Sequence, residues 1–128
     1  MRALLDTHAF IWSETDDPRL SRVAKSFIKD ESNDLLLSAV SVWEIAIKFA
    51  RGRLPLPEEP TPYVNRRVRF LRAESLPVEF LHALEAGSLP THHNDPFDRL
   101  LIAQALVERL PVLTSNPHFA RYGVEVIW

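Results

Sequence analysis

The sequence contains no cysteine, so disulfide bridges, thiolate zinc sites and a thiol nucleophile are all excluded. Its three glycines stand apart from one another, which excludes a glycine-rich phosphate loop. No apolar run approaches the roughly 18 residues that a membrane-spanning helix needs. The early run from Ala3 to Leu5 is interrupted by Asp6, so it has no signal-peptide core either. These absences favour a soluble protein of the reducing cytoplasm, with no membrane partner.

The length and composition indicate one globular domain over residues 1–128. A chain of 128 residues with 46% hydrophobic residues can bury a single core without covalent staples. Short apolar runs alternate with longer stretches of helical period, which is typical of βαβ units. We therefore expect an α/β fold with a mainly parallel sheet of about five strands.

The expected strands cover residues 2–5, 35–37, 74–76, 111–113 and 124–128. The expected helices cover residues 21–29, 41–52, 62–72, 78–86 and 96–107, and a helical turn is expected over residues 116–122. Ser41 and Glu44 fit a capping box at the start of the second helix, in which Trp43 and Ile45 should be buried. Thr61 is the expected N-cap of the third, and Pro62 its first residue.

Three carboxylates follow segments that read as buried strands or begin a buried helix: Asp6, Glu44 and Asp98. Parallel strands deliver their following loops to one edge of the sheet, so distant acids can converge there. Clustered carboxylates of this kind usually hold a hard cation. Each acid also has a structural alternative, since Asp6 could cap the turn after it and Glu44 could complete the capping box with Ser41.

The segment around Asp98 contains further polar residues. Asp95 precedes Pro96 and reads as the helix N-cap with a possible supporting role, which leaves Asp98 as the functional acid. Thr114, Ser115 and Asn116 follow the fourth strand and should reach the same sheet edge. Asn116 could cap the next turn, offer a carbonyl oxygen or position a water. The adjacent His92 and His93 do not fit a tetrahedral zinc site and read as loop histidines.

Positive charge is concentrated between Lys48 and Arg72, where seven basic residues stand against two acids. This excess fits a polyanion-binding surface, and a solvated helix face explains it equally well. If nucleic acid binds here, the backbone contacts would come from Lys48, Arg51, Arg66, Arg69 and Arg72.

Four segments resemble, in order and nearly end to end, the PIN-domain nucleases of the VapC toxin type: LLDTHAFIW, LSAVSVWEIAIK, NDPFDRLLIAQAL and ARYGVEVIW. The resemblance implies a three-layer α/β/α domain, Mg²⁺- or Mn²⁺-dependent cleavage of RNA, homodimerisation and neutralisation by a VapB-type antitoxin. By motif, Asp6, Glu44 and Asp98 match the family's metal-binding acids. Asn116 departs from the family, in which many members carry a fourth acid, and this leaves the number of metal ions open.

Two alternatives to a ribonuclease remain at this stage. Asn116 is compatible with a binding module that has kept the fold and the partner surface without turnover. A Mg²⁺-dependent phosphatase or phospho-acceptor domain could instead use Asp6 as its nucleophile. Such sites usually need a second nearby acid and a later lysine, whereas Thr7 and His8 follow Asp6 and no lysine follows Lys48.

Overall fold

The computed structural model describes residues 1–128 and contains one five-stranded sheet. The strands are β1 (Arg2–Leu5), β2 (Asp34–Ser38), β3 (Glu74–Leu76), β4 (Val112–Leu113) and β5 (Val126–Ile127). They follow the spatial order β3-β2-β1-β4-β5, and every neighbouring pair is parallel. The predicted fold class and all five predicted strands are confirmed.

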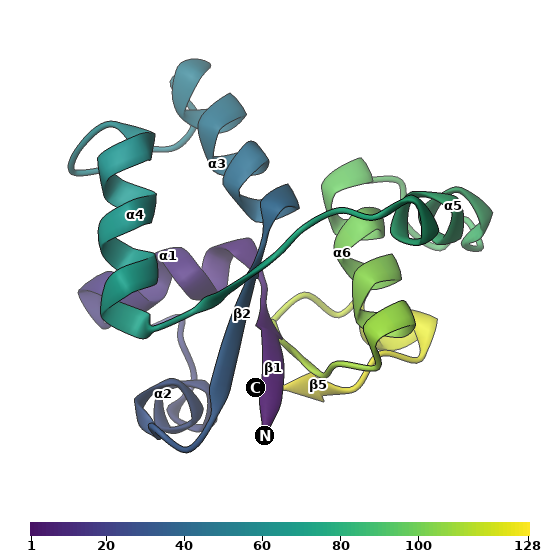
Figure 1. Ribbon diagram of the computed structural model, residues 1–128, viewed down its shortest axis with the longest axis horizontal. Coiled ribbons are helices and arrows are strands. Elements are labelled where there is room, and N and C mark those ends of the chain that lie inside the picture. Colours follow the sequence, from purple (N-terminus) through teal and green to yellow (C-terminus); the bar gives the residue numbers. More distant parts are fainter.

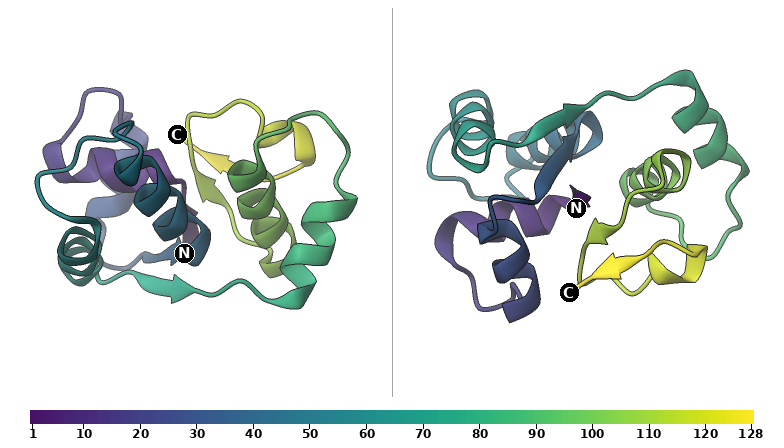
Figure 2. Two further views of the ribbon diagram at one scale, coloured as in Figure 1. Left: turned by 90° about the horizontal axis from the view of Figure 1, so that it is seen from above. Right: turned by 60° about the horizontal axis from the view of Figure 1, so that its bottom comes forward.

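Six α-helices cover the two faces of this sheet: α1 (Thr7–Thr15), α2 (Arg22–Lys29), α3 (Ala39–Ala50), α4 (Pro60–Leu71), α5 (Phe80–Ser88) and α6 (Pro96–Glu108). A short 3₁₀ helix, η1 (Ala120–Tyr122), precedes β5. In Figure 1, α1, α2 and α4 lie on one side of the sheet, and α5 and α6 lie on the other. The chain crosses between these layers through β3, as both views in Figure 2 show. None of these helices combines the length and the apolar character that crossing a membrane requires.

The sheet divides the apolar interior into two cores. Successive residues of a strand point to opposite faces, so Ala3 and Leu5 of β1 pack with α1, α2 and α4, whereas Leu4 packs with α6. The middle of α6 is fully enclosed, as its apolar sequence predicted, and Leu101 and Ile102 have no exposed surface. Because both faces of β1 are covered, its carboxyl end opens only at the edge of the sheet.

Three helix starts differ from the predictions. The helix α5 begins at Phe80, two residues later than expected. The helix α3 begins at Ala39, and its N-cap is Ser38, whose side chain accepts a hydrogen bond from the backbone N–H of Val40. The capping box of Ser41 and Glu44 is therefore wrong, and both residues lie inside the helix. The helix α4 begins at Pro60 after Glu59, so Thr61 is not its N-cap.

Trp43 was expected to be buried, but 58% of its surface is exposed. The helical period predicted an apolar side chain correctly at Ile45, which is fully buried between α3 and the sheet. Trp43 points away from that core and contacts the ring of Phe97 at the start of α6, with 5.1 Å between the ring centroids. Its indole therefore bridges α3 and α6 at the surface.

Candidate metal centre

The carboxyl ends of β1, β2 and β4 meet at one edge of the sheet. From β1 the chain proceeds through β2 to β3 on one side, and it returns to place β4 and β5 on the other. The boundary between β1 and β4 is thus the topological switch point, where α/β folds form their binding crevices. Asp6 and Thr114 follow these two strands directly, and they contact each other.

Asp6 is buried at this switch point and caps α1. Its Oδ1 accepts a hydrogen bond of 2.7 Å from the backbone N–H of Thr7, and its Oδ2 accepts one of 2.7 Å from the hydroxyl of Thr114. The capping role that the sequence left open is therefore present. Burial raises the pKa of Asp6 from 3.8 to about 6; the nearby charge of Asp98 also raises it, against the lowering effect of the Thr114 hydrogen bond.

Glu44 projects from the first half of α3 and is also buried. Its Oε1 lies 2.7 Å from the hydroxyl of Thr7, which also lies 2.9 Å from the hydroxyl of Ser41. A carboxylate can only accept, so the Thr7 hydroxyl donates to Glu44. The other oxygen, Oε2, forms an ion pair with Lys48 one helical turn later. Thr7 thus ties Glu44 to the end of β1, next to Asp6.

Asp98 lies in the first turn of α6, where the helix N-terminus favours a carboxylate. Its Oδ2 accepts hydrogen bonds from Nε2 of His93 at 2.8 Å and from Nδ2 of Asn116 at 3.0 Å. Burial raises the pKa of Asp98, and the charges of Asp95 and Glu44 raise it further, while the His93 hydrogen bond lowers it. Asp98 is therefore close enough to Asp95 and Glu44 for their charges to raise its pKa.

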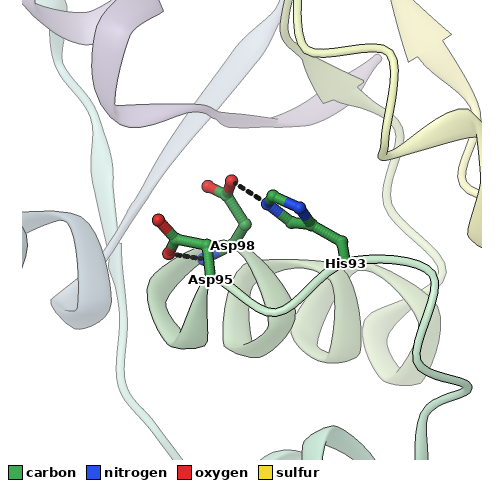
Figure 3. Close-up of side chains that lie close together, drawn as sticks. All are labelled: His93, Asp95 and Asp98. Carbon is green, nitrogen blue, oxygen red and sulfur yellow. Dashed lines mark hydrogen bonds and ion pairs between the residues drawn. The ribbon is translucent and has the colours of Figure 1, made fainter.

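Asp95 caps α6, as the sequence predicted. Its Oδ1 accepts hydrogen bonds from the backbone N–H groups of Phe97 and Asp98, at 2.9 and 3.1 Å. Figure 3 shows the Asp95 and Asp98 carboxylates side by side at the helix start, with the His93 ring directed at Asp98. One donor atom from each of these three residues lies within 4.8 Å of the other two.

The loop after β4 supports both sides of the cluster. Thr114 donates to Asp6 and accepts a 3.0 Å hydrogen bond from the backbone N–H of Asn116. Asn116 in turn donates to Asp98, and its Oδ1 accepts from the backbone N–H of His118 at 3.0 Å, which is the predicted cap of this turn. Ser115 is exposed between them.

Comparison with known proteins identifies the family of this fold. The sequence matches the PIN domain over residues 3–125. This chain belongs to the PIN-domain family. It is 41% identical over 69 residues to ribonuclease VapC16 of Mycobacterium tuberculosis, a match that covers 51% of this chain. The matched part spans about half of that relative, 49% of its length.

Several solved structures share this fold over almost its whole length, and among them is a member of the VapBC family of toxin-antitoxin systems. VapBC2 from Rickettsia felis, bound to a promoter DNA fragment, matches with a TM-score of 0.71 and 16% identity over 98% of this chain and 97% of the other. FitAcB from Neisseria gonorrhoeae has a TM-score of 0.68 and 22% identity, covering 98% and 96%. VapBC-5 from M. tuberculosis has a TM-score of 0.58 and 21% identity, covering 98% and 97%. At these identities the likeness concerns the fold.

In this PIN domain, the predicted site residues have supporting contacts that the sequence did not predict. Thr7 has no role in the sequence prediction, and His93 was expected to be an ordinary loop histidine, yet both contact a predicted metal ligand. Arg99 is a third such residue, and its guanidinium holds the loop that carries His93. Arg99 donates hydrogen bonds of 2.9 to 3.1 Å to the carbonyl oxygens of Ala86, Leu89, Pro90 and His93.

The donor set of the PIN domain fits a hard divalent cation. Oδ1 of Asp98 and Oδ2 of Asp95 accept no hydrogen bond from the protein. Each of the four oxygens of Asp6 and Glu44 accepts one and retains a second lone pair. Burial and, to a lesser extent, the neighbouring acids raise the pKa values of Asp6 and Asp98, and a cation bound by these carboxylates would oppose both effects.

The predicted basic surface is divided by ion pairs. Arg66 binds Glu14 and Glu58, and the buried Arg67 lies beside Glu14. Glu14 lies near the end of α1, whereas Asp6 caps its start, so these pairs lie roughly 12 Å along the helix from the acids. Arg51 is exposed at the end of α3, and Arg69 and Arg72 are exposed in the last turn and at the end of α4. Lys48 is the predicted basic residue in direct contact with a site acid.

Proposed function

We propose that this PIN domain is a metal-dependent endoribonuclease and the toxin of a toxin-antitoxin pair. The observation that supports the proposal is the hydrogen-bond network that links the three acids: Thr7 joins Asp6 to Glu44, and Thr114 with Asn116 joins Asp6 to Asp98. The similarity to ribonuclease VapC16 supports RNA as the substrate. The complexes among the structural neighbours support an antitoxin of the VapB type as the partner.

Asp6, Glu44 and Asp98 would hold Mg²⁺ or Mn²⁺, with Asp95 as a supporting acid. Held by these residues, such a cation would supply Lewis-acid activation of water and would stabilise the negative charge that develops on the phosphodiester. The protein contributes the fixed geometry. Thr7 holds Glu44, and Thr114 holds Asp6, so neither carboxylate has to be ordered when substrate binds.

The basic residues would contact the RNA backbone and add salt-dependent affinity with little sequence preference. Arg51, Arg69 and Arg72 are exposed and have no acidic partner within salt-bridge distance. Arg66 and Lys48 would have to exchange their present carboxylate partners for phosphate. We therefore expect Arg51, Arg69 and Arg72 to contribute more to RNA affinity than Arg66 does.

We also propose that the protein is a homodimer in the cytoplasm, where RNA and an antitoxin would meet it. The outer face of α5 presents Phe80, Leu81 and Leu84 with 60 to 90% of their surfaces exposed. Such an apolar face is unfavourable in water, and a second copy of the chain packed against it would cover it. The acids of the metal centre lie on other elements and would stay open.

Cleavage of a single-stranded RNA by the purified protein in Mn²⁺ tests the proposed activity. Asp98→Ala should lower the rate at least 100-fold, and EDTA should abolish cleavage. The matched control is Asp34→Ala, because Asp34 is exposed at the start of β2 and its side chain makes no hydrogen bond. Equal rates for Asp98→Ala and the unmodified protein would contradict the proposal and indicate a contaminating nuclease.

Two other results would redirect the assignment. Mn²⁺ binding without RNA cleavage, together with intact antitoxin binding, would identify a binding module. A covalent acyl phosphate trapped on Asp6 would identify a phosphoryl-transfer enzyme instead. Brief induction in cells, followed by mapping of the new RNA ends with Asp98→Ala as control, would then identify the RNA that is cleaved.

A further inference from the structure

The two oxygens of Asp98 have different surroundings. Oδ2 accepts two hydrogen bonds, from Nε2 of His93 at 2.8 Å and from Nδ2 of Asn116 at 3.0 Å. Oδ1 accepts none from the protein. Two donors fill the usual hydrogen-bonding capacity of one carboxylate oxygen. A cation would therefore reach Asp98 through Oδ1.

The orientation of Asn116 follows from its other contacts. Its Oδ1 accepts from the backbone N–H of His118 at 3.0 Å, so the amide nitrogen is the group that must face Asp98. An aspartate in this position would accept the same backbone N–H with one oxygen. Its second oxygen would then lie about 3 Å from Oδ2 of Asp98, where two carboxylates repel unless a cation separates them.

Two contacts hold the ring of His93, and a third holds its backbone. It stacks on the ring of His118, with 4.0 Å between the centroids and 12° between the planes. The carbonyl oxygen of His93 accepts from Arg99, and Nε2 is directed at Asp98, as Figure 3 shows. Only 20% of the His93 side chain is exposed. The ring is thus built into the site and is not a mobile loop side chain.

We propose that His93 and Asn116 are positioning residues that hold Oδ2 of Asp98 and make this a one-cation centre. The proposal rests on the proposed function, because it assumes that the acids bind a metal ion. On the Oδ2 side of Asp98, this chain presents two N–H donors. N–H donors stabilise the carboxylate and repel a second cation. Asn116 is then a working part of the centre, and not a lost ligand.

Titration of the full-length protein with Mn²⁺, followed by electron paramagnetic resonance, tests this assignment. The unmodified protein should bind one Mn²⁺ per chain. His93→Ala should weaken Mn²⁺ binding by roughly 10- to 100-fold, because outer partners of ligating carboxylates have effects of this size. His93→Gln retains a donor and should recover most of the affinity. His92→Ala is the matched control, because His92 is exposed and packs on Tyr122 instead of Asp98.

Asn116→Asp tests whether the amide donor of Asn116 limits the centre to one cation. Replacing the donor by a carboxylate should raise the capacity to two Mn²⁺ per chain, and the close pair should broaden the resonance by spin coupling. Thermal unfolding of each variant, followed by circular dichroism, would confirm that the fold is retained.

Three results would overturn the positioning role. They are two Mn²⁺ ions bound by the unmodified chain, unchanged affinity in His93→Ala, and a directly coordinated imidazole nitrogen in the electron spin echo modulation. Any of these would leave the proposed nuclease function intact. Complete absence of Mn²⁺ binding by the unmodified chain would instead contradict the proposed function, and the positioning role with it.

Discussion

Replacing Asp6 by asparagine is expected to stabilise the metal-free protein, although it removes a central acid of the proposed nuclease. The pKa of Asp6 is raised from 3.8 to about 6, chiefly by burial. A folded-state pKa above the unfolded value means that ionisation disfavours the fold. The stability associated with the protonated group is complete below pH 4 and is lost as the pH rises through about 6.

The size of the effect follows from that shift. A difference of about two pKa units corresponds to about 3 kcal/mol of destabilisation at pH 7.5, where the carboxyl is ionised in both states. Asparagine carries no charge, and its Oδ1 can still accept from the backbone N–H of Thr7. The hydroxyl of Thr114 loses its acceptor, which costs about 1 kcal/mol. The net gain should be about 2 kcal/mol, or roughly 8 °C in Tm for a chain of this size.

Urea unfolding in EDTA, followed by circular dichroism at pH 4 and pH 7.5, would measure this gain. Asp6→Asn should be more stable than the unmodified protein at pH 7.5. At pH 4 this gain should disappear, and the lost Thr114 hydrogen bond should make the variant slightly less stable. Asp34→Asn, an exposed substitution in β2, should change neither value. In saturating Mn²⁺ the order should reverse, because only the unmodified site binds the ion tightly. If Asp6→Asn were less stable than the unmodified protein at pH 7.5 in EDTA, the conclusion that ionised Asp6 destabilises the fold would be refuted.

Three further outcomes are expected. Arg99→Lys should lower the free energy of unfolding by about 2 to 4 kcal/mol in urea titrations and should also weaken Mn²⁺ binding. The reason is that one ammonium cannot reach the four carbonyl oxygens that hold the His93 loop. Unchanged Mn²⁺ affinity would show that the loop keeps its conformation without these hydrogen bonds. Leu84→Glu should convert the dimer to a monomer in light scattering without changing the Tm by more than about 2 °C, since 72% of Leu84 is exposed; a retained dimer would place the interface elsewhere. The double substitution Arg69→Ala and Arg72→Ala should reduce the slope of log K against log salt concentration for RNA binding by about two. Arg66→Ala should change this slope less, because Glu14 and Glu58 already bind Arg66. An equal effect of Arg66→Ala would contradict this ranking.

The parts of the fold that depend on local sequence pattern were predictable. Runs such as Leu35 to Leu37 are too apolar to lie anywhere but in a doubly covered strand, and Asp95 before Pro96 is an unambiguous helix start. The start of α3 was not predictable in the same way, because Ser38 and Ser41 both precede suitable helical residues. Tertiary structure decides between them, since β2 pairs with β3 up to Ser38 and the chain turns there.

The residues of the candidate site also differ in whether local sequence or tertiary structure determines them. Asp6 and Asp98 could be predicted as candidate site acids because an acid next to buried apolar residues requires a partner or a function. The supports at His93 and Arg99 depend on how an irregular loop folds back over the start of α6, and no period in the sequence encodes that path. The contact of Asn116 with Asp98 was likewise not predictable, because its donor group is oriented by the backbone of His118.

The central position of β1 also bears on when the proposed metal centre can first be complete. Asp6 and Thr114 contact each other across 108 residues of chain, and Asp98 lies between them in sequence. A nascent chain that has reached α5 already contains Asp6 and Glu44 but neither α6 nor β4. The proposed cation would have only part of its ligand set at that stage. The proposed centre is therefore completed only near the end of synthesis, when the last strands join β1.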